Sequence, residues 1–103
     1  MVSDDFLRMG GKKTAIVLHE KDNVAVTLAD VQAGDACVIR KEDGGEYTLQ
    51  AADAVAFGHK IALSGMEKDD PVFKYGEEIG KMKHPVARGG WIHSHNLYCE
   101  RGM

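Results

Sequence analysis

The chain has 103 residues, which is the size of one domain with a single modest core. Hydrophobic residues make up 44% and charged residues 28%, a composition typical of globular rather than disordered chains. The formal net charge is -3 and the 13 Lys and Arg residues are scattered, which argues against binding of nucleic-acid phosphates. No apolar run approaches the roughly 20 residues that cross a bilayer, and the start lacks the apolar segment of a signal peptide. We therefore expect a cytoplasmic protein that binds neither nucleic acid nor membrane.

Residues 1–12 read as a polar, flexible extension that ends at a pair of glycines, and one domain is expected over residues 13–101. Two cysteines in a chain of this size do not form a disulfide framework. Cys37 lies in the apolar stretch ACVI and is expected to be buried, whereas Cys99 reads as an exposed thiol. The sequence leaves a disulfide between them open.

Short β-like runs follow one another along the chain, separated by turns that contain glycine. The expected strands are TAIVL (14–18), VAVTL (24–28), ACVIR (36–40), YTLQ (47–50), PVFKYG (71–76), EEIGKMK (77–83) and WIHSH (91–95). Asp43-Gly44-Gly45 predicts a tight hairpin between two of them, and Tyr75 with Gly76 and Gly80 predicts another.

The segment 51–63, AADAVAFGHKIAL, is ambiguous, because its alanines favour a helical turn whereas HKIAL alternates like a strand. No stretch has a sustained period of 3.6, and no internal repeat is evident. The pattern predicts an all-β protein, a compact barrel or clip of short strands with at most one or two helical turns.

Two histidines, His93 and His95, stand one residue apart near the end of the chain. On a strand, residues i and i+2 project from the same face, so both imidazoles are expected to point the same way. That arrangement suits a metal ion or a carboxylate, although a metal site needs three or more ligands. His84 is a conceivable third ligand across a hairpin. The alternatives are a solvated turn residue at His84 and an exposed terminal strand at the other two.

Two further polar clusters are candidates for binding. The turn after the first strand presents His19, Asp22 and Asn23; such a turn can contact a polar ligand, but Asp and Asn also serve turns by bonding the local backbone. In the central segment, Gly58 permits close approach of another group. His59 and Lys60 follow it and can bind an anion, or they are ordinary surface residues. The sequence contains no phosphate loop, zinc-ribbon pair, nucleophile elbow or dinucleotide fingerprint.

Four segments taken together resemble one family: LHEKDNVAV (18–26), GHKIAL (58–63), VFKYGEEIG (72–80) and GGWIHSHNL (89–97). They are similar, in order and spacing, to the SAF domain at the N-terminus of altronate and galactarate dehydratases and to the small subunit of (2R)-sulfolactate sulfo-lyase. The resemblance covers residues 13 to about 101. It implies a β-clip fold, a role in sugar-acid catabolism and a cytoplasmic location.

The resemblance also implies a reaction, β-elimination from a 2-hydroxy acid. A proton leaves the carbon next to the carboxylate, and water, or sulfite in the sulfo-lyase, leaves its neighbour. A divalent metal, iron, is implied as the cofactor that polarises the carboxylate and stabilises the developing charge. Because the chain stops after CERGM (99–103), we expect a small subunit of a hydro-lyase, or a shortened piece of a longer enzyme. It would be inactive alone and would act with a large dehydratase subunit on a sugar acid.

By position in the family's motifs, His93 and His95 are expected as catalytic and metal-facing groups. The remaining motif residues are expected to bind substrate: His19, Asp22, Asn23, Gly58, His59, Lys60 and Asn96. Three alternatives stay open: the small subunit of a sulfolactate sulfo-lyase, a non-catalytic β-clip that binds a sugar acid or a protein, and a structural module that self-associates through its strand edges.

Overall fold

The structure is a computed structural model that describes residues 13–99; the expected N-terminal extension lies outside the described residues. Within this range the chain forms strands and turns and no helix, which confirms the all-β prediction. The strands are β1 (Lys13–Ile16), β2 (Val24–Thr27), β3 (Ala36–Arg40), β4 (Glu46–Gln50), β5 (Lys60–Ala62), β6 (Pro71–Lys74), β7 (Glu77–Met82), β8 (Trp91–Ile92) and β9 (Leu97–Tyr98).

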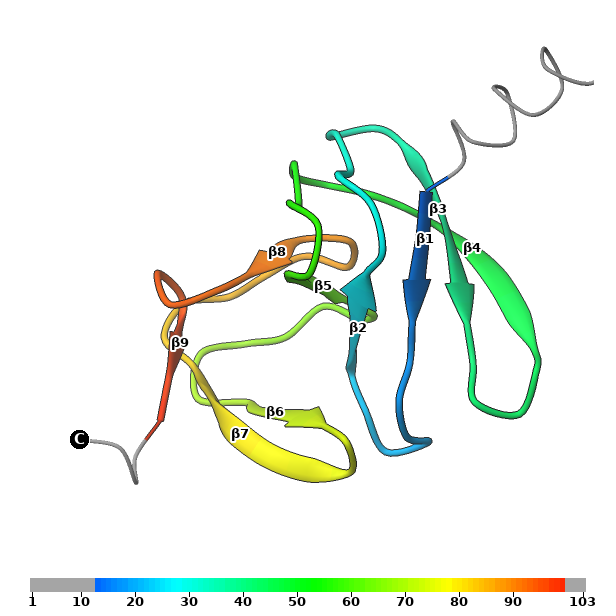
Figure 1. The fold of residues 1–103 in the computed structure, drawn as a ribbon. Coiled ribbons are helices and arrows are strands. Elements are labelled where there is room, and N and C mark those ends of the chain that lie inside the picture. The colour runs from blue at the N-terminus through cyan, green and yellow to red at the C-terminus, as the bar shows by residue number, and fades with distance from the viewer. Residues whose placement is uncertain (1–12, 100–103) are drawn as a thin grey trace, which may run out of the picture.

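The strands form two sheets (Figure 1). The larger has the order β4-β3-β1-β2-β5-β8, and the smaller has the order β6-β7-β9. β1 pairs with β2 antiparallel and with β3 parallel. At one end of the larger sheet, β5 pairs antiparallel with both β2 and β8, so three segments far apart in the sequence lie side by side.

The strands β2, β5 and β8 separate two hydrophobic cores. Successive side chains on a strand point to opposite faces. Ala25, Ile61 and Trp91 therefore pack in one core, which also contains residues of β1, β3 and β4. Their chain neighbours Val24, Ala62 and Ile92 pack in the other, against β6 and β7. Burial on both faces explains why these strands read as continuous apolar runs rather than as an alternation.

One turn type recurs four times along the chain. In residues 32–35, 56–59, 67–70 and 87–90, the fourth N–H donates to the first carbonyl at 2.9–3.1 Å. The third residue has positive φ each time: 90° at Gly34, 83° at Gly58, 72° at Asp69 and 85° at Gly89. Together these features define type II turns, in which a positive φ at the third position favours glycine.

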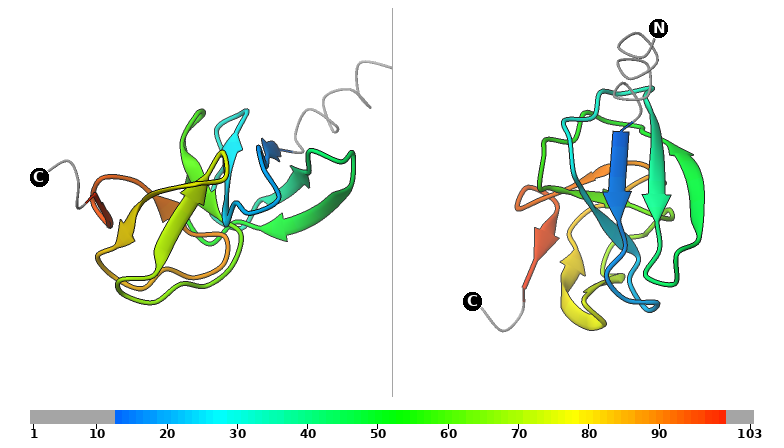
Figure 2. Two further views of the ribbon diagram at one scale, coloured as in Figure 1. Left: turned by 90° about the horizontal axis from the view of Figure 1, so that it is seen from below. Right: turned by 45° about the vertical axis from the view of Figure 1, so that its right-hand side comes forward.

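The four turns are joined in pairs. The residue before each turn forms a two-bond bridge with its counterpart, Val31 with Val55 and Met66 with Val86. Figures 1 and 2 show the first pair as the cyan loop after β2 and the green loop after β4, which run beside each other. The same structural unit, two bridged type II turns, thus occurs twice, although the sequence gives no evident repeat.

Most of the expected strands are present. The exception is the segment that carries the candidate residues His93 and His95. The structure resolves the ambiguous segment 51–63 as a bridge, a turn and strand β5. The expected strand over 91–95 is wrong beyond Ile92, because residues 93–96 form a turn that returns the chain as β9. Tyr75 and Gly76 do form the expected hairpin turn, both at positive φ. Gly80 instead lies inside β7, where an added Cβ would meet the backbone of Tyr98.

Gly34 and Gly89 provide a matched test of the turns. Both stand at the third position of a type II turn, but an added Cβ meets nothing within 4 Å at Gly34 and meets the backbone of Gln50 and Ala52 at Gly89. Gly34→Ala should cost about 1 kcal/mol of unfolding free energy from its positive φ alone. Gly89→Ala should cost about 3 kcal/mol, because a steric clash is added. Urea unfolding of both variants measures this, and equal losses would contradict the account.

Candidate functional site

The register of β5 and β8 brings His59 and His93 together. Lys60 lies opposite Ile92 and Ile61 lies opposite Trp91. Continued by one residue beyond the last pair, the same antiparallel register sets His59 opposite His93. Side chains directly opposite each other on neighbouring strands are close enough to touch. The two rings are stacked, with their centroids 4.3 Å apart and an interplanar angle of 7°.

Trp91 joins these rings into a cluster with His95, which we call the Trp–His cluster (His59, Trp91, His93 and His95). The Trp91 ring lies 5.9 Å from His59 and 5.7 Å from His93 between centroids, with interplanar angles of 16° and 13°. His95 lies 4.4 Å from Trp91 and is tilted by 34°. The Trp91 Nε1–H also donates a hydrogen bond of 3.1 Å to His59 Nδ1. Trp91, His59 and His93 are half-buried, and His95 is exposed.

Asn96 holds the turn that carries His93 and His95. Its buried amide accepts the His93 N–H at 3.0 Å and donates to the Trp91 carbonyl at 2.9 Å. The turn is closed by the N–H groups of Asn96 and Leu97, which both donate to the His93 carbonyl. The Asn96 side chain thus fixes the backbone of the Trp–His cluster, a positioning role within the chain.

Thr27 and the second type II turn hold His59. The buried Thr27 hydroxyl donates to the carbonyl of Ala56 at 2.8 Å and of His59 at 3.2 Å. At the same position of two other turns stand Asp35 and Asp70, whose carboxylates accept a backbone N–H of their own turn. In turn 56–59 this position is His59, which cannot accept the N–H as a carboxylate does. Its ring contacts Trp91 and His93 instead. The fourth turn has Gly90 at this position, so His59 is the one residue of the four whose side chain contacts other rings.

Burial and neighbouring positive groups affect the titration of His93. Burial, followed by the charges of His59, Lys60 and His95, lowers the pKa of His93 from its ordinary 6.5. Burial and the neighbouring Lys74 lower the pKa of the Lys60 ammonium. Lys60 pairs with Ile92, so its side chain points to the face of the sheet opposite that of His59. Its charge therefore acts on His93 without a contact. This lowering favours the neutral imidazole of His93, which is the form that can accept a proton.

The described residues do not fit a complete metal site. Between residues 13 and 99 no three His, Cys, Asp or Glu side chains are close enough to hold an ion. In a stacked pair the nitrogen lone pairs lie in parallel planes, so His59 and His93 cannot both point at one ion. His59 Nδ1 is also occupied by the Trp91 N–H. The third candidate ligand, His84, is exposed and outside the cluster. A metal bound through His93 and His95 needs ligands from elsewhere and stays a prediction.

The candidate residues His19, Asp22 and Asn23 form a separate cluster that anchors the β6–β7 hairpin. The buried Asp22 carboxylate accepts the N–H groups of Tyr75 at 3.0 Å and Gly76 at 2.8 Å. The His19 ring packs so closely on Gly76 that an added Cβ there would lie 3.0 Å from it, and its Nδ1 accepts the Lys21 N–H.

Asn23 spans the same hairpin at its other end. Its amide donates to the Pro71 carbonyl at 2.9 Å and accepts the Phe73 N–H at 2.8 Å. These bonds account for the positions of Asp22 and Asn23 by backbone support alone. Contact with substrate at any of the three residues stays a prediction; His19 and Asn23 are partly exposed, and Asp22 is buried.

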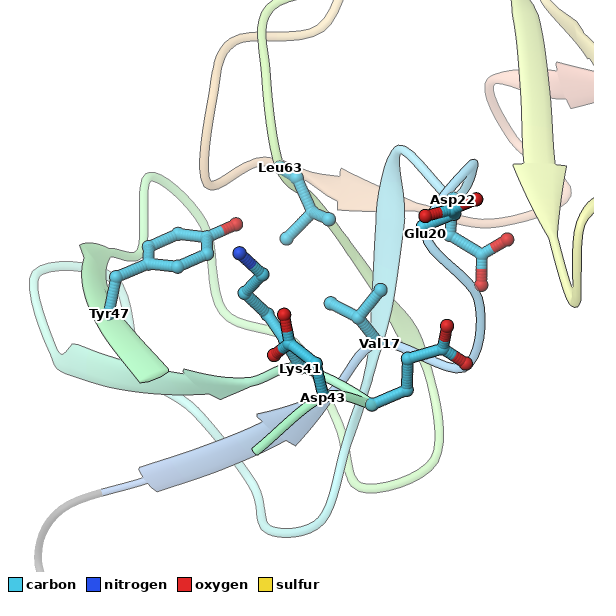
Figure 3. A pocket seen from close by; sticks show the side chains of 8 residues that line it. Val17, Glu20, Asp22, Lys41, Asp43, Tyr47 and Leu63 are labelled. Carbon is cyan, nitrogen blue, oxygen red and sulfur yellow. The ribbon is translucent and has the colours of Figure 1, made fainter. Parts of the chain in front are cut away.

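A hollow of about 380 Å³ near the β3–β4 hairpin is lined by Val17, Glu20, Asp22, Lys41, Glu42, Asp43, Tyr47 and Leu63. Figure 3 shows Tyr47 and Lys41 entering from one side and Glu20 and Asp22 from the other, with Val17 and Leu63 between them. No histidine lines it, and the Asp22 oxygens accept hydrogen bonds from the hairpin backbone.

A second hollow of about 360 Å³ has Trp91 in its wall, with Ala54 and Ala56 among its other residues. It therefore opens beside the Trp–His cluster.

Residue patterns alone missed Trp91 and Lys74 as members of the site. Trp91 is the one tryptophan of the sequence and stands two residues before His93, so its spacing was a usable signal. Lys74 has no such signal, because its effect on Lys60 depends on how β6 approaches the larger sheet.

Cys37 is a buried free thiol as expected, and burial raises its pKa; Cys99 is exposed and free. In the described part of the chain, no helix is long and apolar enough to span a membrane.

We expect Asp22→Asn to destabilise the protein by about 1–3 kcal/mol, because one of the two backbone N–H groups at the hairpin turn loses its charged acceptor. The matched control is Glu20→Gln in the same turn, since Glu20 is exposed and should change the unfolding free energy by less than about 0.5 kcal/mol. Thermal unfolding of both variants gives the comparison. A loss for Asp22→Asn no larger than that of the control would contradict the anchoring role.

Lys60→Met should raise the pKa of His93, because it removes a positive charge that disfavours the protonated imidazole. NMR titration of the His93 ring protons measures the shift. The control is Lys41→Met in the β3–β4 turn, which should leave the His93 titration unchanged. A His93 pKa that falls, or does not move, in Lys60→Met would show that the charge cluster is assigned wrongly.

Comparison with known proteins places this geometry in a family. The chain is 36% identical over 84 residues to altronate dehydratase of Bacillus subtilis, a match covering 82% of the chain and 16% of that enzyme. It is 34% identical over 79 residues to galactarate dehydratase (L-threo-forming) of Escherichia coli, covering 14% of that protein. It is 38% identical over 65 residues to (2R)-sulfolactate sulfo-lyase subunit alpha of Paracoccus pantotrophus, covering 96% of that subunit.

The chain thus spans less than a fifth of these dehydratases and nearly all of the sulfo-lyase subunit. The family model described as the altronate/galactarate dehydratase SAF domain matches residues 13–100. That range contains both sheets, the four type II turns and the whole Trp–His cluster. The chain belongs to the SAF domain family of altronate and galactarate dehydratases.

Proposed function

We propose that this chain is the small component of a hydro-lyase that removes water from a sugar acid of the altronate or galactarate type. In this proposal it works in the cytoplasm, is inactive alone, and brings the Trp–His cluster to an active site completed by a large catalytic partner. One observation carries the proposal: three of the five histidines of the chain meet at one tryptophan beside the strand pairing of β5 and β8. Nothing in the fold requires three imidazoles there, whereas acid–base chemistry uses them.

The reaction needs a proton taken from the carbon next to the carboxylate and a proton given to the departing hydroxyl group. Cleavage of the C–H bond supplies the electron pair of the new double bond, and cleavage of the C–O bond releases the hydroxyl as water. His93 suits one of these transfers, because its lowered pKa keeps it neutral near pH 7. His95 is exposed at the edge of the cluster and suits the other. Asn96 keeps both on one rigid turn.

The other candidate residues take supporting roles in this proposal. Lys60 contributes a positive potential that favours the substrate carboxylate, together with Lys74. His19, Asp22, Asn23 and Gly58 position the hairpin and the turn that flank the cluster. A divalent metal, if the reaction uses one, would be held mainly by residues of the large partner, since this chain does not supply three ligands between residues 13 and 99.

The second candidate is the alpha subunit of a sulfolactate sulfo-lyase, in which sulfite rather than water leaves. The specific observation in its favour is coverage, since the chain matches 96% and 94% of two such subunits. The same cluster serves both reactions, because each begins with removal of a proton next to a carboxylate. The leaving group is what separates them.

Coexpression with the large dehydratase-type subunit of the same organism tests the proposal. The assembled pair should release water from altronate or galactarate, and release of sulfite from (2R)-sulfolactate instead would select the second candidate. The chain alone should be inactive on all three. An assembled pair without any lyase activity would overturn the proposal.

In the active pair, His93→Ala should lower kcat about 100-fold, which is the usual contribution of a positioned general acid or base. The control is His84→Ala, because His84 is exposed and lies outside the cluster. Full activity in both His93→Ala and His95→Ala would mean that the closing motif is structural.

A further inference from the structure

The hydrogen bond between Trp91 and His59 determines which nitrogen of His59 carries a proton. The indole Nε1 is a donor only, so the nitrogen that it contacts at 3.1 Å must offer a lone pair. That nitrogen is His59 Nδ1. A neutral imidazole has one protonated nitrogen, so the proton of neutral His59 is on Nε2.

We propose that Trp91 is a positioning residue that fixes His59 as an Nε2–H hydrogen-bond donor. The two nitrogens lie on opposite sides of Cε1, so the Nε2–H is directed away from Trp91. Rotation of the ring by 180° would set a ring carbon against the indole N–H and forfeit the bond. The nearly parallel stacking of His93 at 4.3 Å and the support of the turn by Thr27 restrain the ring further.

This arrangement divides the work between two stacked imidazoles. His59 offers a fixed N–H and has no free lone pair, so it is a donor and cannot be a base. The Trp91 N–H is given to His59 and not to His93, so the lone pair of the His93 ring is not committed to the indole. A contact between His59 and substrate rests on the proposed function. In that function the His59 Nε2–H would donate a hydrogen bond to a carboxylate oxygen of the substrate, where negative charge grows during proton removal. The tautomer itself is independent of that function.

The tautomer is measured by NMR on the full chain labelled with ¹⁵N, at a pH where the histidines are neutral. His59 Nδ1 should have the shift of an unprotonated nitrogen and should show scalar coupling to Trp91 Nε1 across the hydrogen bond. His59 Nε2 should have the shift of a protonated nitrogen. A proton on Nδ1 would overturn the proposal, and this result needs no variant.

Trp91→Phe tests the cause, because it removes the indole N–H and keeps an aromatic ring. The His59 nitrogen shifts should move towards those of a freely exchanging mixture of tautomers. The matched control is His95→Asn, which removes another ring in contact with Trp91 but keeps the indole N–H, and the His59 tautomer should persist. Unchanged His59 nitrogen shifts in Trp91→Phe would overturn the role of Trp91.

The donor role is tested separately in the assembled enzyme. His59→Gln retains an N–H donor near the Nε2 position, whereas His59→Asn retains polar atoms only near Nδ1. His59→Gln should keep a kcat about tenfold above that of His59→Asn, the value of one hydrogen bond to a charged group. The reverse order would overturn the donor role. A wild-type assembly without lyase activity would count against the proposed function, and the NMR result would still decide the tautomer.

Discussion

The antiparallel pairing of β5 with β8 is the constraint on which the rest of the structure depends. These strands have three and two residues, yet their alternate side chains supply apolar groups to both cores. A shift of one residue in the register would exchange the contents of the two cores, because the side-chain period of a strand is two. It would also separate His59 from His93. The packing of the protein and the geometry of its candidate site therefore share one register.

The repeated type II turns secure that register from outside the strands. Gly58 donates to the Thr27 carbonyl and Gly89 donates to the Ala62 carbonyl, each at the point where a neighbouring strand ends. Gly90 has no room for a Cβ, because one would meet Val86 and Ala87. With Gly90 in place, the Asp53 carboxylate accepts the Trp91 N–H at 3.0 Å. The Gly-Gly-Trp sequence is thus a packing requirement that delivers the tryptophan to the cluster.

The sequence predicted the class of fold and most strands, because local signals of β-branched runs and glycine turns agree with the tertiary structure. It did not predict the turn at 93–96. WIHSH has the alternation of a strand, but a buried Asn96 amide that bonds the His93 N–H and the Trp91 carbonyl ends the strand at Ile92. Nor did local patterns pair His59 with His93, since that contact needs the register of two strands that are far apart in the sequence. The resemblance to the SAF domain placed both segments among its motifs, and the family is confirmed.

The proposed function requires the Trp–His cluster to meet a large partner subunit, and proximity to that partner is its most direct test. A photo-crosslinking residue in place of His95 reports on the exposed edge of the Trp–His cluster, and one in place of Thr48 reports on the exposed outer strand β4. In the assembled complex, the residue at position 95 should crosslink to the large subunit, and added sugar acid should reduce the yield by occupying the shared site. The residue at position 48 should crosslink independently of substrate or not at all. Crosslinking to the large subunit from position 48 but not from position 95 would contradict the account.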